Sequence, residues 1–156
     1  MTSGVEHEGE LPPHMSQPQE QRVLAIDPGR DKCGVAVISL DATGTVHVLQ
    51  RMIVPRRNIG ETIPTLLRQH SVKHIVLGHA TTSGTLQDEL RGALPEVDIT
   101  TVDETGSTLE ARVLYWQEHR PRGWRRLVPL SLQVPPEPVD DFAAVVLARR
   151  FLSAPQ

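Results

Sequence analysis

Residues 23–40 read VLAIDPGRDKCGVAVISL. The segment VLAID (23–27) is predicted to form a strand that Pro28-Gly29 closes, and GVAVISL (34–40) a second strand. Alternation along the first strand places Val23, Ala25 and Asp27 on one face. An acid that ends an apolar strand is costly to bury unless it is hydrogen-bonded or bound to a metal. An Asx turn is the other interpretation of Asp27.

The pattern beyond this segment predicts a third strand and then alternating helices and strands. The third strand is TVHVLQRMIV (45–54), joined to the second by a hairpin turn at 41–44. The remaining elements are expected, in order, as a helix at 59–70, a strand at 74–77, a helix ending at Pro95, a strand at 97–102, a helix at 107–119, a loop at 120–138 and a helix at 139–152. Ser107 and Glu110 have the spacing of a capping box for the third of these helices.

This order predicts an α/β fold. Three hairpin-connected strands followed by βα units give a mixed five-stranded sheet, antiparallel first and then parallel, with helices on both faces.

Composition indicates one cytoplasmic domain preceded by a tail. Residues 1–20 contain four of the 19 acidic residues and no Lys or Arg, so we expect a disordered acidic tail and a folded domain at 21–156. The domain then carries a net charge of about +1, within a total of −3. The single cysteine, Cys33, excludes an internal disulfide and suits a reducing compartment. No secretory signal or apolar run of about 20 residues is present, and we expect no membrane association.

Acidic residues occur at three places that the predicted topology brings to one sheet edge. Asp27 ends the first strand, Asp103-Glu104 follow the last strand, and Asp140-Asp141 open the last helix. Taken singly, Asp103 and Glu104 are interpreted as solvated loop acids. Asp140 and Asp141 are interpreted as first-turn acids that interact favourably with the helix dipole. Taken together, the carboxylates would raise one another's pKa values unless a divalent cation lies between them. Oxygen ligands favour Mg²⁺ or Mn²⁺, and two such ions support phosphodiester hydrolysis.

Three motifs, in this order, resemble the YqgF/RuvX family over residues 22–152. They are Asp27-Pro28-Gly29-(x)4-Gly34-Val35-Ala36-Val37, Val102-Asp103-Glu104-Thr105-Gly106-Ser107-Thr108-Leu109-Glu110-Ala111, and Val139-Asp140-Asp141-(x)2-Ala144. The family is described as RNase H-like Holliday junction resolvases and as nucleases that mature small-subunit ribosomal RNA. The Asp-Pro-Gly segment is also similar to RuvC resolvases.

The resemblance implies an RNase H-like nuclease with Mg²⁺ or Mn²⁺ as cofactor. The catalytic, metal-binding acids would be Asp27, Glu104 and Asp140, with Asp141 as an acid behind them or a ligand of a second metal. The substrate would be branched DNA, in DNA repair, or precursor ribosomal RNA, in rRNA processing. Thr105 replaces an Arg that is frequent in the family, and the loop at 78–85 departs from the family's pattern, so substrate contacts are not carried over to that loop.

Basic and aromatic residues in the loop at 120–138 suit contacts to nucleic acid. Phosphates would bind the arginines and bases would stack on Trp124. The expected nucleic-acid-binding residues are Arg120, Arg122, Trp124, Arg125 and Arg126. A solvated basic loop with packed tryptophans is the alternative. His79, after the fourth strand, is interpreted as a loop histidine or as a proton shuttle.

Two other functions are consistent with parts of the sequence. Actin-like ATPases share the Asp-x-Gly hairpin but need two such domains. A catalytically inactive RNase H-like binding module would be expected to lack one of the acids, and all are present. The expected partners are DNA junctions or RNA, with a homodimer as an alternative to a monomer.

Overall fold

A computed structural model describes residues 20–79, 83–129 and 132–154. Its elements are β1 (Gln21–Pro28), β2 (Lys32–Leu40), β3 (Val46–Pro55), η1 (Arg56–Asn58), α1 (Ile59–His70), β4 (His74–Gly78), α2 (Ser83–Ala93), β5 (Asp98–Val102), α3 (Ser107–Glu118), η2 (Gly123–Leu127) and α4 (Asp140–Ser153). The expected acidic tail lies outside the described residues except for Glu20, which pairs with Arg22 at 2.8 Å.

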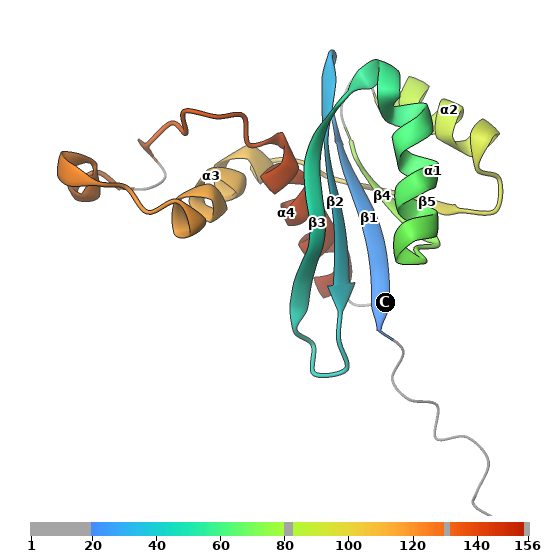
Figure 1. The fold of residues 1–156 in the computed structure, drawn as a ribbon, viewed down its shortest axis with the longest axis horizontal. Helices are drawn as coiled ribbons and strands as arrows, with labels where there is room; N and C mark the ends of the chain where they lie inside the picture. The colour runs from blue at the N-terminus through green and yellow to red at the C-terminus, as the bar shows by residue number, and fades with distance from the viewer. Residues whose placement is uncertain (1–19, 80–82, 130–131, 155–156) are drawn as a thin grey trace, which may run out of the picture.

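The five strands form one mixed sheet in the order β3-β2-β1-β4-β5. β1, β2 and β3 are antiparallel neighbours, whereas β4 runs parallel to β1 and β5 parallel to β4. The predicted topology is therefore confirmed. Figure 1 shows α1 and α2 on one side of the sheet and α3 and α4 on the other.

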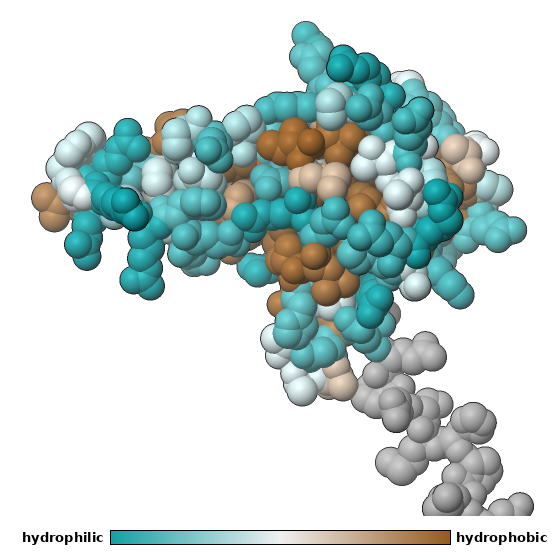
Figure 2. All heavy atoms as spheres, viewed as in Figure 1, coloured by the Kyte–Doolittle hydropathy of each residue, from teal (hydrophilic) through white to brown (hydrophobic). Residues whose placement is uncertain are grey.

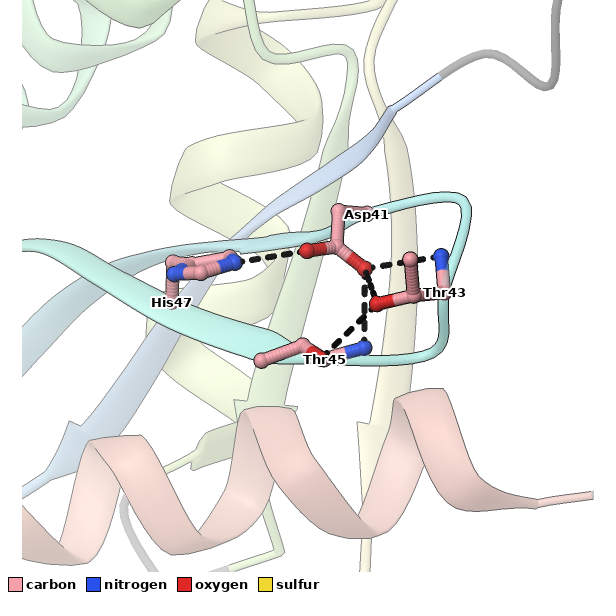
Figure 3. Close-up of polar contacts among 4 residues, drawn as sticks. All are labelled: Asp41, Thr43, Thr45 and His47. Carbon is pink, nitrogen blue, oxygen red and sulfur yellow. Dashed lines mark hydrogen bonds and ion pairs between the residues drawn. The ribbon is translucent and has the colours of Figure 1, made fainter.

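The β2–β3 hairpin is fixed by Asp41 (Figure 3). Its carboxylate accepts hydrogen bonds from the Thr43 hydroxyl at 2.6 Å and from the backbone N–H groups of Thr43 and Thr45 at 2.9 Å each. The His47 ring lies 2.8 Å from the other carboxylate oxygen. The Thr43 hydroxyl, followed by His47, holds the pKa of Asp41 well below its ordinary range. The predicted turn at 41–44 is confirmed.

Alternation along the strands builds a separate core on each face of the sheet. Leu24 and Ile26 of β1 pack with α1 and α2, whereas Val23 and Ala25 pack with α4. All four are fully buried, so β1 contributes to both cores. Cys33 is buried as a small strand residue. α3 packs on α4 through a third cluster that includes Trp116 and Phe142.

The predicted capping box at the start of α3 is wrong. The residue before α3 is Gly106, in the left-handed region at φ 77°, and no side chain caps the helix. Glu110 instead pairs with Arg150 of α4 at 2.6 Å, and Arg150 also donates to the carbonyl groups of Asp103 and Thr105. The Glu110 side chain therefore forms an ion pair with α4 and not the cap that the local sequence pattern predicted.

Within the described residues, no helix has the length and apolar character needed to cross a membrane.

We expect Gly34→Ala to displace the start of α4. A Cβ at Gly34 would collide with the backbone carbonyl of Asp140, which cannot rotate away as a side chain could. Overpacking of this kind costs about 1–3 kcal/mol, measurable as a lower urea midpoint. Gly92→Ala in α2, with nothing within 4 Å, is the control and should cost nothing. Equal stability of Gly34→Ala and the wild type would contradict the close contact.

Candidate active site

Strand pairing brings Asp27 and Glu104 to the same sheet edge. Ile26 pairs with Leu77 in the parallel β1–β4 ladder, so Asp27, one residue before the end of β1, lies level with Gly78 at the end of β4. Gly78 pairs with Val102 of β5, and Glu104 follows two residues later. A Cβ on Gly78 would lie 3.0 Å from Glu104 Oε2 and 3.1 Å from Pro28 Cδ. The glutamate side chain therefore folds back over Gly78 toward the end of β1.

Asp140 reaches the same edge from the other direction, at the first residue of α4. Gly34 is the cross-strand partner of Asp27, and the Asp140 backbone lies directly against Gly34. The first turn of α4 thus rests on the strand pair that carries Asp27. The topology brings together the three predicted metal-binding acids, which belong to three separate elements.

The three carboxylates share one electrostatic environment. Burial raises the pKa of Asp27 to about 7, and the negative charges of Glu104 and Asp140 contribute to that rise. Burial also raises the pKa of Glu104, while nearby His79 opposes that rise. Among the described residues, the Asp27 carboxylate has no hydrogen bond or ion pair to offset its burial. Its negative charge is therefore disfavoured while no cation is present.

The residues fit a hard divalent cation by their chemistry, although the side chains are not arranged as a preformed cage. Within the described residues, no group of three or more His, Cys, Asp and Glu side chains is close enough to hold a metal ion as placed. The donor set consists of carboxylate oxygens alone, which Mg²⁺ and Mn²⁺ prefer. A cation between the carboxylates would remove the repulsion that raises the pKa of Asp27.

Two basic residues that sequence reasoning missed contact the acids of α4. Lys32 Nζ lies 3.0 Å from Asp140 Oδ2, and Arg51 Nε lies 3.1 Å from Asp141 Oδ2. Asp140 and Asp141 thus have different partners, as successive helical residues about 100° apart allow. The pairs join β2 and β3 to the last helix, so no local sequence pattern could have indicated them.

Arg51 connects three elements around Asp141. From β3 its guanidinium binds Glu118 of α3 through two hydrogen bonds of 2.7 and 2.8 Å. It also lies over the Phe142 ring, 3.9 Å from the centroid. Paired and stacked in this way, Arg51 fixes the start of α4 relative to the sheet and α3.

The predicted nucleic-acid-binding residues lie on the segment between α3 and α4, of which residues 119–129 and 132–139 are described. We call this segment the arm. It projects from the sheet, and hydrophilic side chains cover much of it, with apolar surface at its tip (Figures 1 and 2). A surface hollow of about 710 Å³ opens where the arm leaves α3. Its lining includes Arg120, Arg122 and Arg126.

The two tryptophans near the arm have different environments. Trp116 is buried, and its ring N–H donates to the Gln133 carbonyl at 3.3 Å. The Gln133 side-chain amide donates to the backbone carbonyls of Arg125 and Val128, so these hydrogen bonds connect two parts of the arm. Trp124 is 73% exposed. The expectation of packed tryptophans therefore holds only for Trp116, and Trp124 remains free to contact a partner.

His79 lies at the acidic edge. Its backbone N–H donates to the Val102 carbonyl at 2.9 Å, and its side chain, which is exposed, is close enough to Glu104 to influence the pKa of that residue. The next residues of this loop, 80–82, lie outside the described residues.

Comparisons with known proteins establish the fold. No protein-family model and no curated protein sequence matches the chain. RuvC of T. thermophilus, solved in complex with a Holliday junction substrate, superposes with a TM-score of 0.55 at 13% identity, covering 83% of this chain and 91% of RuvC. The Fowlpox virus resolvase, solved with Holliday junction DNA, gives 0.57 at 10% identity, covering 86% of this chain and 100% of the resolvase. The chain has the RNase H-like fold of these proteins, as expected.

The environment of Asp27 predicts a pH-dependent gain in stability for Asp27→Asn. Because the folded-state pKa is raised to about 7, ionisation of Asp27 destabilises the fold increasingly as pH rises from about 4 to 7. The variant should therefore be more stable than the wild type by roughly 1–4 kcal/mol at pH 8 without metal, and equal to it near pH 4. Melting temperatures in EDTA at both pH values measure this.

Asp88→Asn, on the exposed face of α2, controls for loss of one negative charge elsewhere. A stability difference between Asp27→Asn and the wild type that is the same at pH 4 and pH 8 would contradict the raised pKa.

Proposed function

We propose that the protein is a divalent-metal-dependent nuclease of the YqgF/RuvX kind that hydrolyses phosphodiester bonds in branched DNA. The observation that carries this proposal is the meeting of Asp27, Glu104 and Asp140 at one edge of an RNase H-like sheet. Two proteins of similar fold were solved with Holliday junctions, which supports a four-way junction as the first substrate to test. Precursor ribosomal RNA, implied by the family resemblance, is the second.

The three acids are proposed as the metal ligands and catalytic residues. A bound Mg²⁺ or Mn²⁺ supplies an activated water and stabilises the leaving oxygen of the phosphodiester. Asp27, whose pKa is raised by burial and by the charges of the other two acids, would carry its negative charge fully if a cation offset these effects. Glu104, just after β5, and Asp140, at the start of α4, both raise the pKa of Asp27, which supports a shared role for the three acids. Asp141, paired with Arg51, has a supporting role near the site.

The arm is proposed as a second region of contact with nucleic acid. Its arginines, all exposed, provide bidentate donors for phosphate. Trp124 presents a free aromatic face on which an unpaired base can stack, an interaction worth roughly 1–3 kcal/mol per base. Branched DNA offers duplex phosphates and, at the branch point, bases that can be released from the stack, which suits this combination of residues.

Cleavage assays with a labelled four-way junction test the proposal. We expect strand cleavage in Mg²⁺ or Mn²⁺, none in EDTA, and none by a folded Asp27→Asn or Asp140→Asn variant. Asp141→Asn is the matched comparison, one residue further along α4, and should retain measurable activity that recovers partly as Mn²⁺ is raised. Parallel assays with flap DNA, single strands and precursor ribosomal RNA identify the preferred substrate.

Three results would contradict the nuclease assignment or refine it. Cleavage that survives in EDTA or in folded Asp27→Asn would exclude the metal mechanism. Tight junction binding without cleavage under any metal would favour the inactive binding module. An Asp141→Asn variant less active than Asp140→Asn would exchange the roles of these two acids.

The arm should determine how strongly binding depends on salt. Replacing Arg122, Arg125 and Arg126 by Ala should weaken binding of all sequences. The log–log salt slope should flatten by roughly 0.7–0.9 for each phosphate that the variant no longer neutralises. Fluorescence anisotropy between 50 and 200 mM salt, about the range where such interactions matter, measures this slope.

A second triple variant controls for the change in net charge. It replaces three exposed arginines on the α1–α2 side by Ala, namely Arg57, Arg68 and Arg91. An arm variant with the wild-type slope, or a control variant with an equal change, would show that the arm does not contact phosphate.

A further inference from the structure

A lysine lies at the proposed metal site, on the acid that α4 supplies. Lys32 is the first residue of β2, directly after the turn that follows Asp27. Its ammonium lies 3.0 Å from Asp140 Oδ2. Among the described residues it is the one basic side chain with an ion pair to any of the three acids. Lys32 therefore brings a flexible positive charge to the acidic edge.

The fold does not need this ion pair. The Lys32 and Asp140 side chains are 44% and 36% exposed, and ion pairs of such exposure stabilise proteins by about 0–1 kcal/mol. The start of α4 is already fixed by backbone contact with Gly34 and by the pairing of Arg51 with Asp141. Because stability does not require the pair, Lys32 is free to act in binding.

The chemistry of lysine suits a phosphate at this place. Its ammonium is a compact charge on a flexible four-carbon stem, and it binds phosphate oxygens without fixed directionality. A nucleic-acid strand cleaved at the acidic site must bring its scissile phosphate close to Asp140. Among the described residues, the basic side chain paired with Asp140, and therefore next to that phosphate, is Lys32.

We propose that Lys32 is a substrate-positioning residue that pairs with Asp140 in the metal-free protein and with a phosphate oxygen of the nucleic acid in the metal-loaded complex. This rests on the proposed nuclease function. Lys32 competes with the metal for the Asp140 carboxylate before substrate binds, and it attracts the scissile phosphate afterwards.

The proposal predicts opposite effects of one substitution on two measurements. Lys32→Gln removes a positive charge next to a metal ligand, so Mn²⁺ alone should bind about three- to tenfold more tightly. The same change removes a phosphate contact, so the cleavage rate at saturating Mn²⁺ should fall, by about tenfold or more. A lysine that merely holds Asp140 in place would change both measurements in the unfavourable direction.

The experiment uses the full chain and two probes. Calorimetric titration with Mn²⁺ measures metal affinity without nucleic acid, and single-turnover cleavage of a four-way junction at saturating Mn²⁺ measures catalysis. Lys32→Arg keeps the charge and should stay within about fivefold of the wild type in both. Lys73→Gln is the matched control, because Lys73 is the other lysine of the chain. It directly precedes β4, at the end of that strand opposite to Gly78 and the acidic edge. The Lys73→Gln variant should match the wild type in both measurements.

Each result decides the proposal. Tighter Mn²⁺ binding with slower cleavage in Lys32→Gln, and near-normal behaviour of Lys32→Arg, support it. Weaker Mn²⁺ binding, or no change in cleavage, overturns it while leaving the nuclease function intact. A wild-type protein that neither binds Mn²⁺ nor cleaves the junction overturns the metal site itself, and the proposed role of Lys32 with it.

Discussion

Backbone contact between Gly34 and the first turn of α4 determines where the candidate site can form. Because no side chain separates them, the helix starts directly above the β1–β2 pair, beside the cross-strand partner of Asp27. Buried residues further along α4, among them Ala144 and Leu147, then cover the sheet. The contact therefore sets both the packing of one sheet face and the approach of the third carboxylate, so stability and the site depend on one glycine.

The neighbouring acids of the site differ in how firmly basic side chains pair with them. Arg51 engages Asp141 from a position that is already stacked on Phe142 and paired with Glu118, which makes that contact rigid. Lys32 engages Asp140 through a single exposed pair that is easily exchanged. Among the described residues, Asp27 has neither kind of partner, and burial raises its pKa to about 7. Pairing with basic residues therefore weakens from Asp141 through Asp140 to Asp27. A cation would be most favourable next to Asp27, at the sheet edge.

The sequence indicated features that depend on local periodicity and missed those that depend on pairs distant in the chain. Strand alternation placed Val23 and Ala25 on one face correctly, and the turn at 41–44 followed from its residues. The capping box failed because Arg150, 40 residues away, binds Glu110. The contacts of Lys32 and Arg51 with α4 could not be read from spacing, since they depend on how the last helix crosses the sheet. The proximity of Asp27 and Glu104 was foreseeable because parallel strands end at one edge of a sheet, whereas the approach of Asp140 also depends on the contact of α4 with Gly34.

The position of α4 at the end of the described chain has a consequence for how the protein is made. This helix packs on one face of the sheet and also carries the surface on which α3 packs. Until the ribosome has delivered it, the apolar residues of that face, including Ile38 and Val76, have no cover. Folding on that face is therefore completed only after α4 has been synthesised, and until then the sheet is exposed to contact with other chains.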